Sequence, residues 1–166
     1  TQTARYVTAI SHTSCKLLDT RKTIPGLRAA QKYAVLCGGG INHRMGLFDA
    51  ILIKENHIAA AGSIRKAIAA ARESFPDVLI EVEVENLDEF EQALDAGPDR
   101  ILLDNFSNEA LRSACMLNSG CNQLEASGNI KLENIAEVAE TGVHFISTGS
   151  ITKNIHAIDL SMLLIP

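Results

Sequence analysis

The amino-acid sequence predicts an incomplete, TIM-like parallel α/β barrel of about six strands, formed as one domain by residues 1–166. Two observations carry this prediction. Short runs rich in Val, Ile and Leu alternate with longer helical stretches, which is typical of right-handed βαβ units and a parallel sheet. The last four strand ends also recur at intervals of 21, 23 and 21 residues, at Glu83, Asp104, Ser127 and Thr148. A barrel stacks βα units of that size.

Six strands are expected, each a short apolar run that ends in polar or turn residues. They are residues 16–21, 50–54, 79–85, 100–104, 123–127 and 145–149. The length of 166 residues is short for a full eight-stranded barrel, which needs about 250. A doubly wound open sheet uses the same units and is the alternative. It is weakly disfavoured because no G-x-G-x-x-G motif follows the first strand.

Four helices are expected between the strands. They are residues 63–73, 87–96, 108–116 and 132–141. Asp88 and Asn108 suit N-cap positions, because their side chains can accept a backbone N–H of the first turn. Gly97 and Gly142 suit the ends of two helices, since glycine adopts the left-handed conformation that stops a helix.

The composition favours a cytoplasmic enzyme without nucleic-acid or membrane partners. The net charge of −5 lacks the basic character of a nucleic-acid-binding protein. No apolar run reaches the length of a membrane span, and the first residues lack the pattern of a signal peptide. The four cysteines have no metal-binding spacing and are expected to be free thiols. Because the chain opens on Thr1 without a methionine, we expect a piece of a longer polypeptide.

Polar residues follow the apolar part of every predicted strand, and in a parallel barrel such strand ends face the active site. In the third strand, alternation places Glu81, Glu83 and Glu85 on one face. Buried carboxylates need cations or a metal as partners, and Lys54 and Asp104 lie at the same level of the barrel. The alternative for the third strand is a solvent-facing edge, and that for Lys54 is a lysine that simply leaves the sheet for water.

Two further groups of residues suit anions. Three glycines, Gly38 to Gly40, precede His43 and Arg44, and an Arg fork suits a carboxylate or a phosphate. A plain loop is the alternative for the glycines. The tips of the last two strands suit a phosphate, because small residues expose backbone N–H groups and barrels often bind phosphate there. These tips are Ser127-Gly128-Asn129 and Thr148-Gly149-Ser150, and ordinary turns are their alternative.

Taken together, these segments resemble the carboxylating nicotinate-nucleotide pyrophosphorylases, the quinolinate phosphoribosyltransferase family. The resemblance covers essentially the whole chain, and the combined order of the segments is far more specific than any single motif. The matching segments are residues 18–28, 32–35, 38–40, 42–44, 52–57, 81–87, 103–106 and 142–150.

The resemblance implies transfer of phosphoribosyl from 5-phosphoribosyl 1-pyrophosphate to quinolinate with decarboxylation, as in the de novo biosynthesis of NAD. It assigns the quinolinate carboxylates to Arg21, His43, Arg44 and Lys54, with Thr20 and Lys22 beside them in the substrate-binding site. It assigns the ribose hydroxyls and Mg²⁺ to Glu83 and Asp104, which with Lys22 form the implied catalytic set. It assigns the 5-phosphate to Ser127, Gly128, Asn129, Thr148, Gly149 and Ser150.

The family also has an N-terminal domain before the barrel, which this sequence is expected to lack. The resemblance implies that this domain builds a homodimer or a higher oligomer and lends an Arg to a neighbouring subunit's quinolinate site. We therefore expect this chain by itself to be inactive, and its surface to expose apolar residues. Two other functions stay open: an anion-binding scaffold without turnover, and a Schiff-base aldolase that uses Lys54 as nucleophile.

Overall fold

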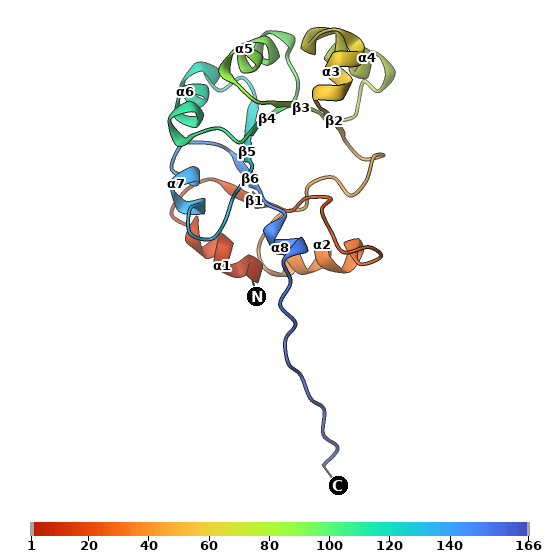
Figure 1. Cartoon of the computed structure of the whole chain (residues 1–166), viewed down its shortest axis with the longest axis vertical. Helices are drawn as coiled ribbons and strands as arrows, with labels where there is room; N and C mark the ends of the chain where they lie inside the picture. The colour runs from red at the N-terminus through yellow and green to blue at the C-terminus, as the bar shows by residue number, and fades with distance from the viewer. Residues whose placement is uncertain (1, 166) are drawn as a thin grey trace.

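The computed structural model describes residues 2–165, and within them six strands form one parallel sheet in the order β1-β6-β5-β4-β3-β2. The strands are β1 (Lys16–Leu18), β2 (Ile51–Ile53), β3 (Ile80–Val84), β4 (Arg100–Asp104), β5 (Gln123–Ser127) and β6 (Phe145–Ser147). Figure 1 shows them as an inner ring, surrounded by helices, that stays open between β1 and β2. The predicted incomplete barrel is confirmed. The doubly wound alternative, which needs helices on both faces of an open sheet, is wrong.

Eight helices lie in the described part of the chain and mostly alternate with the strands. They are α1 (Gln2–Ala9), α2 (Arg28–Cys37), α3 (Glu55–Ala61), α4 (Ile64–Ser74), α5 (Leu87–Ala96), α6 (Asn108–Asn118), α7 (Ile135–Ala139) and α8 (Ser150–Lys153). The four predicted helices are α4 to α7. The sequence analysis does not predict the other four. One reason is clear for α3, which is short and has no fully buried residue, since only Ile58 and Ala61 pack partly against the core.

Two features of the helix starts correct the sequence analysis. Asn86, and not Asp88, caps α5, because its Oδ1 accepts the backbone N–H of Glu89 at 2.9 Å. Ser107 caps α6, so Asn108 is instead its first residue. In the first case β3 ends at Val84, so the chain turns into α5 before it reaches Asp88.

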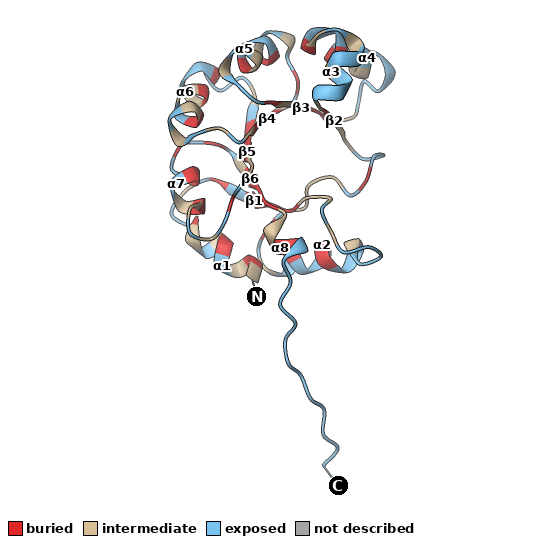
Figure 2. Ribbon diagram, in the orientation of Figure 1, coloured by how far each residue is buried: buried red, intermediate tan, exposed pale blue. Residues whose placement is uncertain are grey.

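The two faces of the sheet have different surroundings. Its outer face packs against the helices in an apolar core that includes Val82, Phe90 and Ile101. Its inner face carries Glu81 and Glu125, which are fully buried. Figure 2 shows the strands as a mostly buried band at the centre of the ring. The sheet therefore separates an ordinary apolar core from a charged barrel interior.

The opening between β1 and β2 is crossed by the chain that joins α2 to β2 (Figure 1). Part of this connection pairs with β1, because Ile41 forms an isolated parallel bridge with Leu18. The Ile41 N–H donates to Leu17 at 2.8 Å, and the Asp19 N–H donates to Ile41 at 3.2 Å. The bridge brings the residues after Ile41 to the edge of the barrel without a regular strand.

The three glycines before Ile41 shape this connection and do not line the two hollows at the barrel mouth. Gly38 ends α2, and a Cβ added there would lie 2.5 Å from the Thr3 Cβ of α1. Gly39 has a φ of 86°, which favours glycine. The plain-loop interpretation of this run is therefore correct.

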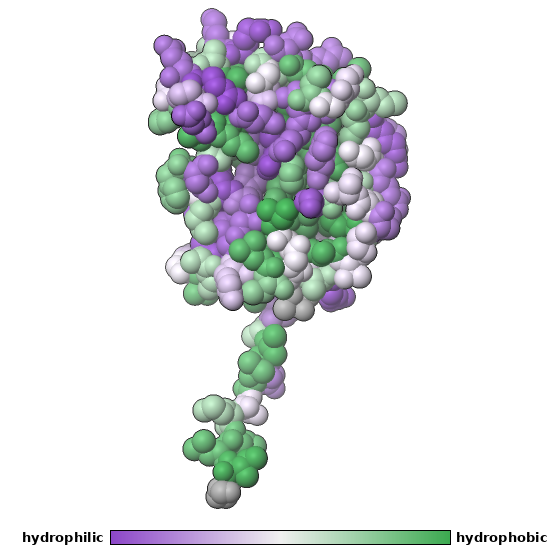
Figure 3. Space-filling view, turned by 180° about the vertical axis from the view of Figure 1, so that it is seen from behind, coloured by the Kyte–Doolittle hydropathy of each residue, from purple (hydrophilic) through white to green (hydrophobic). Residues whose placement is uncertain are grey.

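Several apolar residues are exposed, as the sequence analysis expects. Tyr33, Leu47 and Phe48 project from α2 and the connection that follows it. The segment after α8 extends away from the barrel and carries more of them, as the green end of the chain in Figure 3 shows. Among residues 2–165, no helix has both the length and the apolar character needed to cross a membrane.

Candidate functional site

The carboxyl ends of the strands meet at one mouth of the barrel, because all six strands are parallel. β1, β2, β3 and β6 end sooner than predicted there, at Leu18, Ile53, Val84 and Ser147. All the residues that the sequence assigns to the site line one or both of two adjoining hollows at this mouth.

The first hollow, which we call the cationic chamber, has a volume of about 280 Å³. It contains every residue that the sequence assigns to a dicarboxylate. Its lining is Thr20, Arg21, Lys22, His43, Arg44, Leu52, Lys54, Glu83, Leu102, Glu125, Ser127 and Ser147. Four Arg and Lys side chains against two Glu make it a place for an anion.

The second hollow, which we call the glycine chamber, has a volume of about 470 Å³. Its lining is Thr20, Lys22, Asp104, Asn105, Ser127, Gly128, Asn129, Ile130, Lys131, Ser147, Thr148, Gly149, Ser150, Lys153 and Asn154. It contains every residue that the sequence assigns to a phosphate. The two chambers share Thr20, Lys22, Ser127 and Ser147, so one ligand can extend from one into the other.

Arg21 and Arg44 form a pair of like charges in the cationic chamber. Burial lowers the pKa of Arg44, and the nearby charge of Arg21 lowers it further. The Nε of Arg21 is buried and has no hydrogen-bond partner among the described residues. An anion between the two guanidinium groups would relieve both the repulsion and the unpaired donor.

Lys54 and Glu83 form an ion pair across β2 and β3, between Nζ and Oε2. Lys54 follows β2 directly, and Glu83 lies on the inner face of β3, so the predicted partnership of the two is confirmed. Glu81 on the same face is fully buried, and β3 lies between β2 and β4. The alternative of a solvent-facing edge strand is therefore wrong.

Asp104 lies apart from this ion pair, at the end of β4. Its Oδ1 accepts the Ser127 hydroxyl at 3.0 Å, and its Oδ2 accepts the Asn105 amide at 2.8 Å. These bonds fix the carboxylate between the loops after β4 and β5. Asp104 consequently presents a held, half-buried negative charge to the glycine chamber.

Gly128 allows the loops after β4 and β5 to pack closely. Its φ is +94°, and an added Cβ would lie 2.2 Å from the Asn105 side-chain oxygen and 2.8 Å from the Asn105 nitrogen. Asn105 and Asn129 themselves have positive φ values of 56° and 52°. Only glycine fits this position, because any side chain would push the two loops apart.

Other members of the glycine chamber differ in what they can offer a ligand. The Thr148 hydroxyl donates to the Ile130 carbonyl at 3.0 Å and accepts the Ser150 N–H at 3.2 Å, so it is already used. Lys131 and Lys153 also line the chamber, and the sequence analysis misses both. The one feature of the sequence that points to these two lysines is that each follows a polar strand end by a few residues.

Glu81 and Glu125 form a buried acidic pair next to His43, which we call the acidic floor, and Glu125 lines the cationic chamber. The His43 Nε2 lies 2.9 Å from Glu81 Oε2 and 3.5 Å from Glu125 Oε2. The Arg100 Nη1 donates to Glu125 at 3.2 Å. Burial, followed by the charge of Glu81, raises the pKa of Glu125 to about 8, and burial also raises the pKa of Glu81. The pair therefore retains a proton at neutral pH.

The neutral ring of His43 presents an N–H group, and not a lone pair, to Glu81 and Glu125. The Arg44 N–H donates to His43 Nδ1 at 2.8 Å, so the hydrogen of the neutral ring is on Nε2. His43, Glu81 and Glu125 have the mutual spacing of metal ligands, within 4.8 Å of one another. Because Nε2 carries the hydrogen, it cannot ligate a metal ion in this arrangement. The sequence analysis assigns no role to Glu125, although strand alternation places it on the face of Ser127.

Replacing Glu125 by glutamine is expected to flatten the dependence of stability on pH. The pKa of Glu125 is about 8 in the folded chain against an ordinary value of 4.5. The unfolded chain releases this proton between those values while the folded chain keeps it, so stability falls as the pH rises through that window. Urea unfolding at pH 5 and pH 8.5 measures the effect. If the wild type and Glu125→Gln lose the same stability between pH 5 and pH 8.5, the raised pKa of Glu125 is contradicted.

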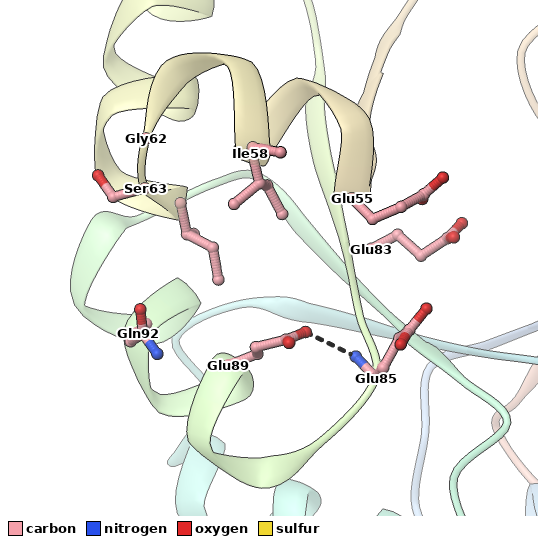
Figure 4. Close-up of a pocket in the computed structure, with 10 residues that line it drawn as sticks. Glu55, Ile58, Gly62, Ser63, Glu83, Glu85, Glu89 and Gln92 are labelled. Carbon is pink, nitrogen blue, oxygen red and sulfur yellow. Dashed lines mark hydrogen bonds between the residues drawn. The ribbon is translucent and has the colours of Figure 1, made fainter.

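A third hollow, of about 400 Å³, lies between α3, α4 and α5 and meets the cationic chamber at Glu83. Its lining includes Glu55, Glu83, Glu85 and Glu89 and no Arg or Lys. Figure 4 shows the carboxylates of Glu55, Glu83 and Glu85 turned to the same side, with the Glu85 N–H donating to Glu89. Carboxylates repel an anion, so a polyanionic ligand belongs in the two chambers and not here.

Comparisons with known proteins agree with this geometry. The family described as "Quinolinate phosphoribosyl transferase, C-terminal domain" matches residues 1–163. The nicotinate-nucleotide pyrophosphorylase [carboxylating] of Mycobacterium leprae is 44% identical over 98% of this chain and 58% of its own length. The probable enzyme of that name from Bacillus subtilis is 44% identical over 98% of this chain and 56% of its own. The structure of the nicotinate-nucleotide pyrophosphorylase from Francisella tularensis superposes with a TM-score of 0.95, at 57% identity, over 97% of this chain and 57% of that one.

The fold and the two chambers define a parallel-barrel protein with a positively charged hollow at the mouth formed by its strand ends. The chain belongs to the quinolinate phosphoribosyl transferase family and matches its C-terminal domain. It spans a little over half of the length of the relatives named above.

Proposed function

We propose that this chain carries the active site that transfers phosphoribosyl from 5-phosphoribosyl 1-pyrophosphate to quinolinate. The products are nicotinate mononucleotide, pyrophosphate and CO₂, as in the de novo synthesis of NAD. The observation that carries the proposal is the cationic chamber joined to the glycine chamber through Thr20, Lys22, Ser127 and Ser147. The names of the relatives support the same reaction.

Quinolinate brings two carboxylates on neighbouring ring carbons, and the cationic chamber supplies their partners. Arg21 and Arg44 suit them best, because a guanidinium donates two parallel hydrogen bonds to one carboxylate. Lys54 adds a third positive charge, and Thr20 and Lys22 stand beside them. His43 forms the wall of this site, since its Nε2–H faces the acidic floor.

The glycine chamber supplies the contacts for the 5-phosphate. The backbone N–H groups of Gly128, Asn129 and Gly149 can point to an anion, and Gly149 leaves room for a close approach. Lys22, Lys131 and Lys153 bring positive charge to the same space. The phosphate of the ribose is thereby held on the side of the mouth opposite to the dicarboxylate.

In the reaction, the lone pair of the pyridine nitrogen forms a bond to C1 of the ribose. The bond from C1 to the pyrophosphate oxygen breaks, and its electron pair leaves with pyrophosphate. Glu83 and Asp104 stabilise the positive charge that develops on the ribose, and Lys22 stabilises the departing anion. The carboxylate next to the nitrogen then leaves as CO₂, and the ring carbon takes a proton from water. Holding both substrates in position contributes much of the rate.

The same proposal includes Mg²⁺ at Glu83 and Asp104. Mg²⁺ prefers oxygen ligands and is commonly held by one or two carboxylates together with substrate phosphates. Glu83 fits this use because its Oε1 is not engaged by Lys54, which contacts Oε2. When bound, Mg²⁺ would neutralise charge on the pyrophosphate.

Assembly and location complete the proposal. We propose a homodimer or a higher oligomer, and the exposed apolar side chains of Tyr33, Leu47 and Phe48 support it. We propose a cytoplasmic enzyme, and the four free cysteines are consistent with a reducing compartment.

The aldolase alternative is less well supported. A Schiff base forms from the free amine of a lysine, whereas the contact of Lys54 with Glu83 stabilises the ammonium form. Borohydride trapping of a carbonyl substrate on Lys54 would favour the aldolase. The scaffold alternative is tested by whether the protein converts quinolinate to nicotinate mononucleotide.

Once the protein is assembled with the family's N-terminal domain, incubation with quinolinate, 5-phosphoribosyl 1-pyrophosphate and Mg²⁺ is expected to release nicotinate mononucleotide, pyrophosphate and CO₂ in equal amounts. Mass spectrometry with carboxyl-labelled quinolinate measures all three. Nicotinate, which lacks the carboxylate next to the nitrogen, is the control acceptor and should give no CO₂. If calorimetry shows that neither substrate binds, the proposal is wrong; if both bind without turnover, the scaffold alternative holds.

A further inference from the structure

Asp19 and Lys32 form an ion pair that solvent does not reach, since both side chains are 0% exposed. Asp19 directly follows β1, and Lys32 extends inward from α2. Neither residue lines the cationic or the glycine chamber. A buried ion pair is often no more stabilising than two apolar side chains of similar size. Stability alone therefore gives little reason for these two charges.

The same two residues hold the peptide groups of His43 on both sides. The Asp19 Oδ1 accepts the His43 N–H at 2.9 Å, and the Lys32 Nζ donates to the His43 carbonyl at 2.8 Å. Asn42 completes the network, because its amide donates to Asp19 Oδ2 at 2.6 Å and to the Lys32 carbonyl at 2.9 Å. All these bonds converge on the segment of residues 42–44.

The backbone of this segment has no strand partner, although the His43 ring lies against Glu81 and the Arg44 side chain donates to the Ala50 carbonyl. It lies in the opening between β1 and β2, where its bridge to β1 ends at Ile41. His43 and Arg44 nevertheless form one wall of the cationic chamber. The Arg44 N–H donates to His43 Nδ1, so a displaced His43 would displace Arg44 as well. Elsewhere in the barrel, wall residues like His43 and Arg44 are held by a strand. In this opening, the ion pair of Asp19 and Lys32 takes the place of the strand.

We propose that Asp19 and Lys32 are positioning residues of the dicarboxylate site. They do not touch the ligand, and they act by holding His43 and Arg44 against β1. The inference rests on the proposed function, because it names what sets the shape of that site. Loss of the pair should weaken binding of the dicarboxylate and leave binding of ribose 5-phosphate in the glycine chamber unchanged.

Two variants separate positioning from stability. Lys32→Met leaves the Asp19 carboxylate buried without a cation, so urea unfolding should show a large loss of stability. The double variant Lys32→Met with Asp19→Asn removes both charges and should regain most of it. In the double variant, the asparagine at position 19 has one acceptor oxygen, whereas the carboxylate of Asp19 has two. The His43 carbonyl also still lacks the hydrogen bond that Lys32 donates in the wild type. We expect the double variant to bind quinolinate roughly tenfold or more weakly, because small displacements are costly at a preorganised site.

Ile68→Ala is the matched control, because it removes a buried side chain of α4 far from this network and also destabilises the fold. Calorimetry with quinolinate should give this control the wild-type dissociation constant. The inference is overturned if the double variant, with its stability regained, also binds quinolinate like the wild type. The pair would then serve the fold alone.

A second measurement keeps this test separate from that of the proposed function. Hydrogen exchange of the His43 and Arg44 amides, without any ligand, reports whether the segment is held. Protection in the wild type that is lost in the double variant supports the inference, and unchanged protection overturns it. If the wild type binds no quinolinate at all, the proposed function fails, and amide exchange still decides whether the pair holds the segment.

Discussion

Replacing Arg21 by methionine is expected to lower the affinity for quinolinate about a hundredfold, since a bidentate charged contact contributes about 3 kcal/mol. The fold should not lose stability. Arg21 is close enough to Arg44 to lower the pKa of Arg44, and its buried Nε has no partner among the described residues. Removing the Arg21 side chain therefore breaks no hydrogen bond of its Nε and relieves the repulsion between Arg21 and Arg44. Calorimetry and urea unfolding on the same protein samples measure the two effects.

Arg65→Met is the matched control for this prediction. Arg65 is exposed on α4, so the variant changes the net charge equally and leaves the cationic chamber intact. We expect wild-type affinity from it. Equal losses in the two variants would indicate attraction by overall charge alone, and no loss from Arg21→Met would remove Arg21 from the site. Arg21→Lys should be intermediate, because an ammonium keeps the charge and loses the fork.

Replacing Glu83 by glutamine, or Asp104 by asparagine, is expected to lower kcat by about 10²- to 10³-fold, as for other preorganised groups that stabilise a charged transition state. Both changes keep the shape of the side chain and remove a negative charge from the proposed ribose site. Quinolinate should bind as tightly as before, or more tightly with Glu83→Gln, because Lys54 then loses its carboxylate partner. Steady-state kinetics and calorimetry together separate these effects.

Glu85→Gln is the control on the same strand end. Glu85 is exposed and lines neither chamber, so removing its charge should leave kcat near the wild-type value. A comparable fall in kcat from Glu85→Gln would mean that negative charge anywhere near β3 has the effect. A wild-type kcat in both Glu83→Gln and Asp104→Asn would rule out their proposed role.

The parts of the site that lie on strands could be predicted from the sequence. Alternation along β3 places Glu81 and Glu83 on one face, and the following strands end in Asp104 and Ser127 at regular intervals. Parallel strands bring their ends together without further information, because the geometry of the sheet does it. This is why residues far apart in the chain line the two chambers as predicted.

The parts that depend on side chains meeting across elements could not be predicted. Lys32 lies on a helix, and nothing in its neighbours in sequence indicates that it reaches Asp19 beneath β1. The pairing of Glu125 with Glu81 depends on the register in which β3 and β5 flank β4. The glycines at residues 38–40 illustrate the opposite error, since they suggest a ligand loop and in fact end α2 against α1.

Calorimetric titration of the protein with quinolinate and ribose 5-phosphate, singly and together, tests the central claim most directly. The claim is that the mouth of the barrel has two adjoining chambers, one for a dicarboxylate and one for a phosphate. We predict that the two ligands bind at the same time, one of each per chain, and that Arg21→Met weakens binding of quinolinate alone. Mutually exclusive binding, or equal loss of both ligands in Arg21→Met, would contradict it.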